Sequence, residues 1–315
     1  MRRLVVHGLA VAGATLFACN ALFGIEPGYL RDSGTDVAEA PDAPLDSAPR
    51  DARLDSELDA RLDSGLDARL DSSPDARPDS SPDANVDAGP CPGGMLVIPA
   101  DTFLMGADDG IPNEAPAHLV TVDAFCMDVN EVTVASYAQC VSSGGCTPTV
   151  REDALCTAHT VPVRGNHPIN CLTRVQAASY CLRAGKRLPT EEEWEYAARG
   201  TTEHTYLWGN TAPTQPLCID RPDTCPVGYY TYDLSPLGLK DMAGSVSEWT
   251  SSGYSADYTP AALLLRDPNR PVFRGAAFST TEDDDVALRV TRRSDGTTTS
   301  RSSSIGFRCA KSVAR

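Results

Sequence analysis

Residues 91–315 predict one irregular α/β domain with low regular secondary structure. Three observations support this fold class. Short apolar runs near residue 95 predict strands, two later segments carry helix-capping signals, and the chain after Gly200 has only brief apolar runs among many Gly, Pro, Asp and Ser residues. All three tryptophans and ten of the eleven cysteines lie in this part, so its long loops have candidate cross-links.

The first predicted elements are strands. Residues 95–106, MLVIPADTFLMG, predict a strand, a turn and a second strand, with Pro99 at the break. Residues 118–125, HLVTVDAF, alternate apolar and polar side chains, which is typical of a half-buried strand.

Two helices with clear boundary signals follow. One begins at Thr190, whose hydroxyl can cap the helix while Glu193 reaches back, and it ends at Gly200. The other runs from about residue 173 to 184. Its spacing predicts one buried face, made of Val175, Ala178 and Leu182.

The first residues predict an exported, lipid-anchored protein. Arg2 and Arg3 precede an apolar run, and Cys19 closes that run in the sequence LFAC, which resembles a lipoprotein signal. The run is shorter than the roughly 20 apolar residues that span a bilayer. Residues 1–18 are therefore predicted to be a signal peptide and Cys19 to be lipidated, on the periplasmic or the cell-surface side. The alternative is a cleaved secretory signal that ends at a cysteine by chance.

Residues 19–90 predict a disordered, Asp-rich linker. An eight-residue unit such as DARLDSEL repeats from Asp51 to Pro90 without any aromatic residue, so apolar burial cannot offset chain entropy. Residues 31–90 carry 16 Asp or Glu against 6 Arg and thus contribute −10 of the formal net charge of −16. The remainder is mildly acidic and has no basic stripe, which excludes nucleic acid as a partner.

Eight motifs in the folded part resemble, in their order, those of the formylglycine-generating enzyme (sulfatase-modifying factor) family: MLVIPADTFLMG, EVTVASY, HPINC, YCLRAGKRLPTEEEWEYAARG, YLWGN, GLKDMAGSVSEWT, VFRGAAF and IGFRCA. The resemblance covers residues 95–310. It implies an elaborated variant of the C-type lectin fold that binds calcium. Enzymes of the family use oxygen and a Cu(I) ion, held by two cysteines, to oxidise a sulfatase cysteine to formylglycine.

The resemblance places those two cysteine positions at Thr280 and Asp285, counted from Phe278. Neither side chain supplies the soft thiolate that Cu(I) prefers, so copper is not expected. The predicted function is a monomeric, non-catalytic envelope module that binds a protein, peptide or glycan. The alternatives are the formylglycine-generating oxidase itself, or another oxidative reaction in the same cleft. The resemblance assigns to this cleft Arg274, Phe278, Arg293 and Ser304.

The resemblance also implies a disulfide between Cys181 and Cys309. A second family disulfide is absent, because its positions are Ala198 and Val290. Close spacing favours Cys140 with Cys146 and Cys218 with Cys225, whereas Cys91, Cys126, Cys156 and Cys171 have no assigned partner. For Cys156, a zinc site with His159 is the weaker alternative to a disulfide.

Calcium is implied at the motif DMAGSVSEW. The implied ligands are the carboxylates of Asp241 and Glu248 and the backbone carbonyls of Gly244 and Val246. Hard oxygen ligands of this kind suit Ca²⁺. The alternative is a loop in which the two carboxylates accept hydrogen bonds from backbone N–H groups.

Overall fold

The computed structural model describes residues 91–313 apart from 151–153, 160–162 and 282. The predicted signal peptide, Cys19 and the linker of residues 19–90 lie outside the described residues. Within the described part, no helix combines the length and the apolar character needed to cross a bilayer.

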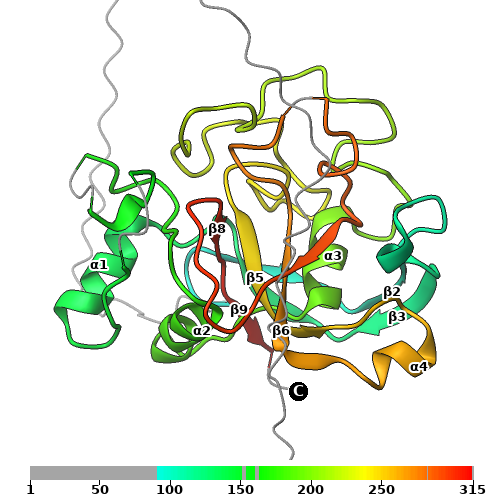
Figure 1. The fold of residues 1–315 in the computed structure, drawn as a ribbon, viewed down its shortest axis with the longest axis horizontal. Coiled ribbons are helices and arrows are strands. Elements are labelled where there is room, and N and C mark those ends of the chain that lie inside the picture. The colour runs from blue at the N-terminus through cyan, green and yellow to red at the C-terminus, as the bar shows by residue number, and fades with distance from the viewer. Residues whose placement is uncertain (1–90, 151–153, 160–162, 282, 314–315) are drawn as a thin grey trace, which may run out of the picture. The chain divides into compact units, whose positions relative to one another are not determined.

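The first four strands of the domain form two small antiparallel sheets, one of which also contains the last strand (Figure 1). In one, β4 (Phe125–Asp128) lies between β1 (Met95–Ile98) and β9 (Ala310–Ser312), so the last described strand pairs with one of the first. The other is a hairpin of β2 (Asp101–Met105) and β3 (His118–Val122). These strands confirm the predictions for residues 95–106 and 118–125.

A third sheet has four strands in the order β7-β6-β5-β8. Its centre is the antiparallel pair β5 (Ser247–Tyr254) and β6 (Asp267–Arg274). The short strands β7 (Arg293–Asp295) and β8 (Ile305–Gly306) flank the pair, and β8 is parallel to β5. Sequence patterns did not predict this sheet, because its strands carry many polar residues and little alternation.

Helix α3 (Glu191–Arg199) has the predicted boundaries. The Thr190 side chain accepts a hydrogen bond from the Glu193 N–H, and the Glu193 side chain accepts one from the Thr190 N–H. Gly200 caps the other end at a positive φ of 64°, where a residue without a Cβ is favoured.

Helix α2 (Arg174–Arg183) agrees with the predicted range of about 173–184, and Thr173 caps its start, but the prediction of its buried face is wrong. Ala177 and Cys181 are the buried positions. The predicted face of Val175, Ala178 and Leu182 is exposed, with Val175 at 60% and Leu182 at 74%. Cys181 is fixed in a disulfide, which turns its side of the helix toward the core.

The remaining helices are short. Helix α1 (Val134–Ser142) is capped by Thr133, whose hydroxyl accepts from the Ser136 N–H. Helix α4 and two 3-10 helices complete the described helical elements, at Pro260–Leu263, Pro112–Glu114 and Thr157–His159. Long stretches such as residues 200–246 contain no helix or strand, in agreement with the predicted irregular α/β class of low regular content.

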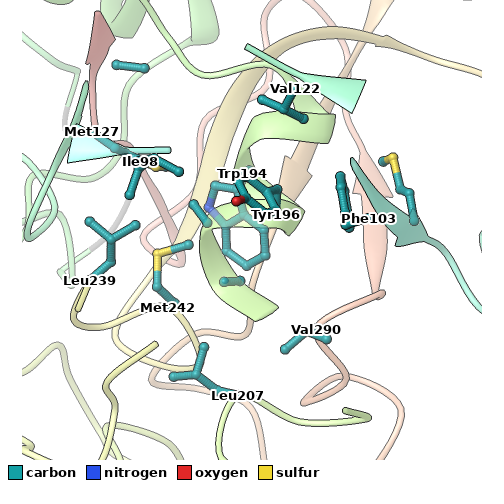
Figure 2. Packing of buried hydrophobic residues seen from close by; sticks show 14 of the residues in the cluster. Ile98, Phe103, Val122, Met127, Trp194, Tyr196, Leu207, Leu239, Met242 and Val290 are labelled. Carbon is teal, nitrogen blue, oxygen red and sulfur yellow. The ribbon is translucent and has the colours of Figure 1, made fainter. Parts of the chain in front are cut away.

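The largest apolar cluster surrounds α3. Figure 2 shows the side chains of Trp194 and Tyr196 in the middle of this cluster. They pack with Ala198 of the same helix and with residues from the first strands and from the irregular loops, including Ile98, Phe103, Met127, Leu207, Leu239, Met242 and Val290. Ala198 and Val290, the positions of the absent second family disulfide, thus contribute apolar packing to the same cluster.

Five disulfides cross-link the described residues. Cys181–Cys309 closes the longest separation, 128 residues. The two close-spaced pairs that the sequence favoured are also joined, Cys140–Cys146 and Cys218–Cys225. The four cysteines without an assigned partner form Cys91–Cys126 and Cys156–Cys171, so the Cys156 thiolate is not available to zinc.

Candidate functional site

Two arginines assigned to the cleft lie in the interior instead. Arg274 Nη1 is 3.0 Å from Glu191 Oε1, and its Nη2 pairs with Glu195. Arg293 Nε is 2.7 Å from the same Glu191 oxygen. All four side chains are fully buried, so the arginines hold α3 against β6 and β7 and do not line an open cleft.

This buried network is electrostatically matched. Burial alone would lower the pKa of Arg274, but the charges of the Glu195 and Glu191 carboxylates outweigh it and raise the pKa above its ordinary value. The Tyr258 hydroxyl donates to Glu191 Oε1 at 3.0 Å. Burial, followed by the charge of Glu191, raises the pKa of Tyr258, so this phenol keeps its proton as a hydrogen-bond donor.

The Cys218–Cys225 loop is hydrogen-bonded to the start of the segment in which the resemblance places the two cysteine positions, Thr280 and Asp285. The Asp220 N–H donates to the Thr280 carbonyl at 2.7 Å, and the Arg221 N–H donates to the Phe278 carbonyl at 2.8 Å. Phe278 is buried, and the Thr280 hydroxyl accepts from the Ala277 N–H at 3.1 Å. A disulfide-closed loop is therefore attached along the backbone of residues 278–280.

The other two residues assigned to this region lie nearer the surface. The Ser304 hydroxyl is 3.0 Å from that of Ser279, which places Ser304 beside the Phe278–Thr280 segment. Asp285 is exposed and interacts with Tyr206. The pKa of Tyr206 is raised mainly by its burial and further by the charge of Asp285. Phe278, Thr280 and Ser304 are thus brought together, and the polar side chains among them carry hydroxyl groups.

The implied calcium ligands are separated into two environments. Both oxygens of Glu248 pair with Arg308, with Nε 2.8 Å from Oε2 and Nη2 2.7 Å from Oε1. The indole N–H of Trp194 also donates to Glu248, at 2.8 Å. Glu248 is therefore satisfied by buried donors. Gly244 and Val246 lie in the turn before β5, both buried.

Asp241 faces a second carboxylate, that of Glu131. Asp241 has a positive φ of 57°, and its Oδ2 accepts from the Gly228 N–H. Glu131 is 3% exposed, and its carboxyl group lies within hydrogen-bonding reach of the Asp241 carboxyl, with no other side-chain donor beside its oxygens. Asn130 Oδ1, which lies beside Gly228, is also buried without a partner. Three hard oxygen groups thus converge near Gly228.

The charges of this cluster are unbalanced. Burial raises the pKa of Glu131 well above its ordinary value, and the charge of Asp241 raises it further. Burial likewise raises the pKa of Asp241. If both carboxyl groups were ionised, their charges would repel one another in a buried environment. A proton shared between them or a bound cation would relieve this repulsion. The surrounding carboxyl groups exceed the surrounding cations by two, since Glu131, Asp233, Asp241 and Glu248 face Arg308 and Lys240.

Sequence reasoning missed Glu131 and Asn130. Glu131 stands in the motif EVTVASY, 110 positions before Asp241, and no local spacing connects the two. The available signal was an acidic residue two positions before Thr133, which caps helix α1. A side chain of that kind is usually solvent-exposed, and only its burial distinguishes it here.

Comparisons with known proteins agree with the motifs. A model of the sulfatase-modifying factor enzyme 1-like domain matches residues 82–313. The chain is 29% identical to the formylglycine-generating enzyme of Mus musculus, with 69% of this chain and 74% of that protein covered. It is 31% identical to the inactive C-alpha-formylglycine-generating enzyme 2 of Mus musculus, with 70% and 86% covered.

One group of relatives is much longer. The chain is 31% identical to the serine/threonine-protein kinase Pkn1 of Chlamydia trachomatis, over 70% of this chain. It spans only 38% of the length of that protein.

Solved structures show the same fold. PvdO from Pseudomonas aeruginosa superposes with a TM-score of 0.56 at 23% identity, covering 72% of this chain and 96% of PvdO. CarF superposes with a TM-score of 0.51 at 18% identity, covering 70% of this chain and 98% of CarF. These likenesses establish the fold and, at such identities, nothing about the ligand.

Proposed function

Because the chain belongs to the family of sulfatase-modifying factor enzyme 1-like domains, we propose that its folded part is a non-catalytic binding module of the cell envelope. The observation that carries the proposal is that Thr280 and Asp285 stand at the positions to which the family resemblance assigns the two copper-binding cysteines. Hydroxyl and carboxylate oxygens are hard donors and are poor ligands for Cu(I). One relative is itself named an inactive enzyme, so loss of activity is compatible with this family.

Two further features support a binding role. Every cysteine among the described residues is joined in a disulfide, so none of them supplies a replacement thiolate. The Cys218–Cys225 loop is also hydrogen-bonded along residues 278–280. A loop fixed in this position suits a preformed recognition surface better than a groove that must admit an unfolded peptide.

The test is an oxidation assay. The purified protein is incubated with a cysteine-containing sulfatase peptide, oxygen and Cu(I), and formylglycine is measured by mass spectrometry. The proposal predicts no product above a protein-free control and no tight Cu(I) site. Formylglycine formation that depends on the protein would overturn the proposal and establish the oxidase.

Calcium is proposed as the structural ion of the module, at Asp241 and Glu131 with Asn130. The buried oxygens of Glu131 and Asn130 fit a hard cation, because Ca²⁺ binds carboxylate and amide oxygens. Glu248 is not included, since Arg308 already pairs with both of its oxygens. When bound, the ion would offset the excess negative charge and stabilise the turn that contains Asp241.

Thermal unfolding tests the calcium proposal. Calcium is expected to raise the Tm relative to EDTA, because an ion that binds only the folded state stabilises it by mass action. Glu131→Gln is expected to remove most of that increase, whereas Asp109→Asn, at a side chain that is 79% exposed, leaves it unchanged. An equal calcium response in all three proteins would contradict the assignment.

Export and lipid anchoring complete the proposal. The Arg2–Arg3 start, the apolar run and LFAC support a lipoprotein signal, and the acidic repeats support an extended spacer between membrane and domain. In cells fed a labelled fatty acid, the wild type should carry the label and fractionate with membranes. Cys19→Ser should do neither, and label on Cys19→Ser would rule out Cys19 as the lipidated residue.

A further inference from the structure

The long loops between α3 and β5 carry no helix or strand (Figure 1). Side chains of these loops line a hollow with aromatic walls. It has a volume of about 390 Å³, at the lower end of the ~300–1,000 Å³ typical of small-ligand sites. Its lining consists of Trp208, Pro213, Thr214, Gln215, Leu217 and Tyr232. The same loop, residues 213–217, lines a second hollow of 280 Å³ with Ile219.

The aromatic walls differ in how firmly they are held. The Trp208 ring stacks on Tyr206, with 5.6 Å between ring centroids and an interplanar angle of 7°. Its indole N–H donates to the Thr211 carbonyl at 2.9 Å, which fixes the ring in its plane. Tyr232, by contrast, is 56% exposed, so much of its phenol is accessible to a ligand.

The scaffold behind the hollow is rigid. Leu217 is buried in a cluster with Tyr206 and Ile219, and Cys218 closes the next loop by its disulfide to Cys225. This loop is the one that is hydrogen-bonded to residues 278–280, which anchors it to a second segment of the domain. A preformed wall lowers the entropy that a ligand loses on binding.

The lining selects a neutral ligand rich in hydroxyl groups. None of the six lining side chains is charged. The Gln215 amide and the Thr214 hydroxyl can each both donate and accept hydrogen bonds, as sugar hydroxyl groups do. The π faces of Trp208 and Tyr232 carry partial negative charge, which attracts the C–H groups on the flat face of a pyranose ring.

A peptide fits the same lining less well. Peptides in aromatic grooves present carbonyl acceptors and need N–H or O–H donors from the groove. Pro213 and Pro216 have no backbone N–H to pair with an extended strand, and the indole N–H of Trp208 is already committed to Thr211. Only side-chain donors such as Thr214 and Gln215 remain, and these suit separate hydroxyl groups better than the regular backbone ladder of a peptide.

We propose that the hollow between Trp208 and Tyr232 binds the pyranose ring of a neutral glycan. This inference rests on the proposed binding function and specifies the ligand class. Trp208 stacks on one face of the sugar, Tyr232 closes over the other side, and Gln215 with Thr214 bonds the hydroxyl groups.

Tryptophan fluorescence of the purified full chain provides the primary test. The chain has three tryptophans, and Trp194 and Trp249 are 1% and 0% exposed, so ligand-induced changes report on Trp208. Methyl β-glucoside, methyl β-galactoside and diacetylchitobiose are the sugar probes, and a polyproline peptide is the competing probe. At least one sugar is expected to give a saturable change. A response to the peptide alone would overturn the proposal.

Calorimetric titration of variants then locates the site. Trp208→Ala and Tyr232→Ala are each expected to weaken binding of the responding sugar by about fivefold or more. Tyr229→Ala is the matched control, because Tyr229 is 66% exposed and is not among the lining residues. Near-UV circular dichroism checks that each variant is folded.

The outcomes separate the two proposals. Sugar binding that survives Trp208→Ala, or no sugar binding at all, would overturn this inference and leave the non-catalytic function in place. Formylglycine formation in the peptide assay would overturn the non-catalytic function, whatever the sugar result.

Discussion

Arg308 pairs with both carboxylate oxygens of Glu248 in the centre of the domain, although the two residues are 60 positions apart. Arg308 also donates to the carbonyls of Asp128, Val129 and Lys240. One guanidinium therefore connects β4, the loop before β5, and β5 itself. The hydrogen bonds of one side chain thus join three segments that do not pair with one another in a sheet.

Breaking this pair is expected to destabilise the domain strongly. Glu248→Gln or Arg308→Gln alone should lower the free energy of unfolding by about 3–5 kcal/mol, because each leaves a buried charge without its partner. The double variant should lose less than the sum of the single losses. Denaturant titration of the oxidised proteins measures all four forms, and strictly additive losses would contradict a direct coupling.

The long disulfide is expected to matter more than a short one. In the chain-entropy model, removing Cys181–Cys309 as a double alanine variant should cost about 5 kcal/mol, against about 2.4 kcal/mol for Cys140–Cys146. The difference arises because the separations are 128 and 6 residues. Tm values of the two double variants check the order, and a reversed order would show that packing rather than loop closure dominates.

Restoring thiols at the family positions should restore copper binding. The double variant Thr280→Cys with Asp285→Cys is expected to bind Cu(I) much more tightly than the wild type, because two thiolates then share one site. Thr280→Cys alone is the control for a single added thiol. Competition against a Cu(I) chelator measures the affinity. Equal affinities for the double and single variants would mean that Thr280 and Asp285 are not the corresponding positions.

Glu114 is expected to make stability depend on pH. The side chain is fully buried, its Oε2 accepts from the Thr291 hydroxyl at 2.7 Å, and Oε1 has no partner. Burial raises its pKa above the ordinary 4.5, against the opposing effects of Thr291 and nearby arginines. The folded state therefore holds the proton more tightly than the unfolded state. The stability from this group is complete below pH 4.5 and is lost as pH rises through the raised pKa.

Glu114→Gln isolates this effect. Relative to the wild type, the variant should gain stability progressively as pH rises above 4.5, since glutamine has no proton to lose. Unfolding free energies of both proteins across the acid-to-neutral range provide the measurement. A difference that stays constant with pH would show that Glu114 titrates alike in both states.

Substitutions on the exposed and the buried face of α2 should differ in their effect on the free energy of unfolding. Leu182→Ala is expected to change the unfolding free energy by less than about 0.5 kcal/mol, because Leu182 is 74% exposed. Ala177→Val should cost about 1–3 kcal/mol, because Ala177 is fully buried and the added methyl groups overpack the core. A large loss of unfolding free energy in Leu182→Ala would indicate that Leu182 is buried, as the sequence spacing predicts.

The sequence alone predicted the features that depend on residues close together in the chain. The cap at Thr190, the stop at Gly200 and the first strands depend on neighbours within a few positions, and the structure confirms them. The disulfide from Cys181 to Cys309 followed from family resemblance rather than from any local pattern. The irregular class itself followed from the scarcity of apolar runs after Gly200.

Tertiary packing alone decided the rest. The buried face of α2, the pairing of Glu248 with Arg308, and the contact of Glu131 with Asp241 all depend on which distant segments meet. Periodicity describes one helix in isolation, and a charge in a sequence carries no record of its burial. Because desolvation and long-range contacts set the energy of a buried carboxylate, only the folded chain shows that Glu131 meets another carboxyl group while Glu248 meets Arg308.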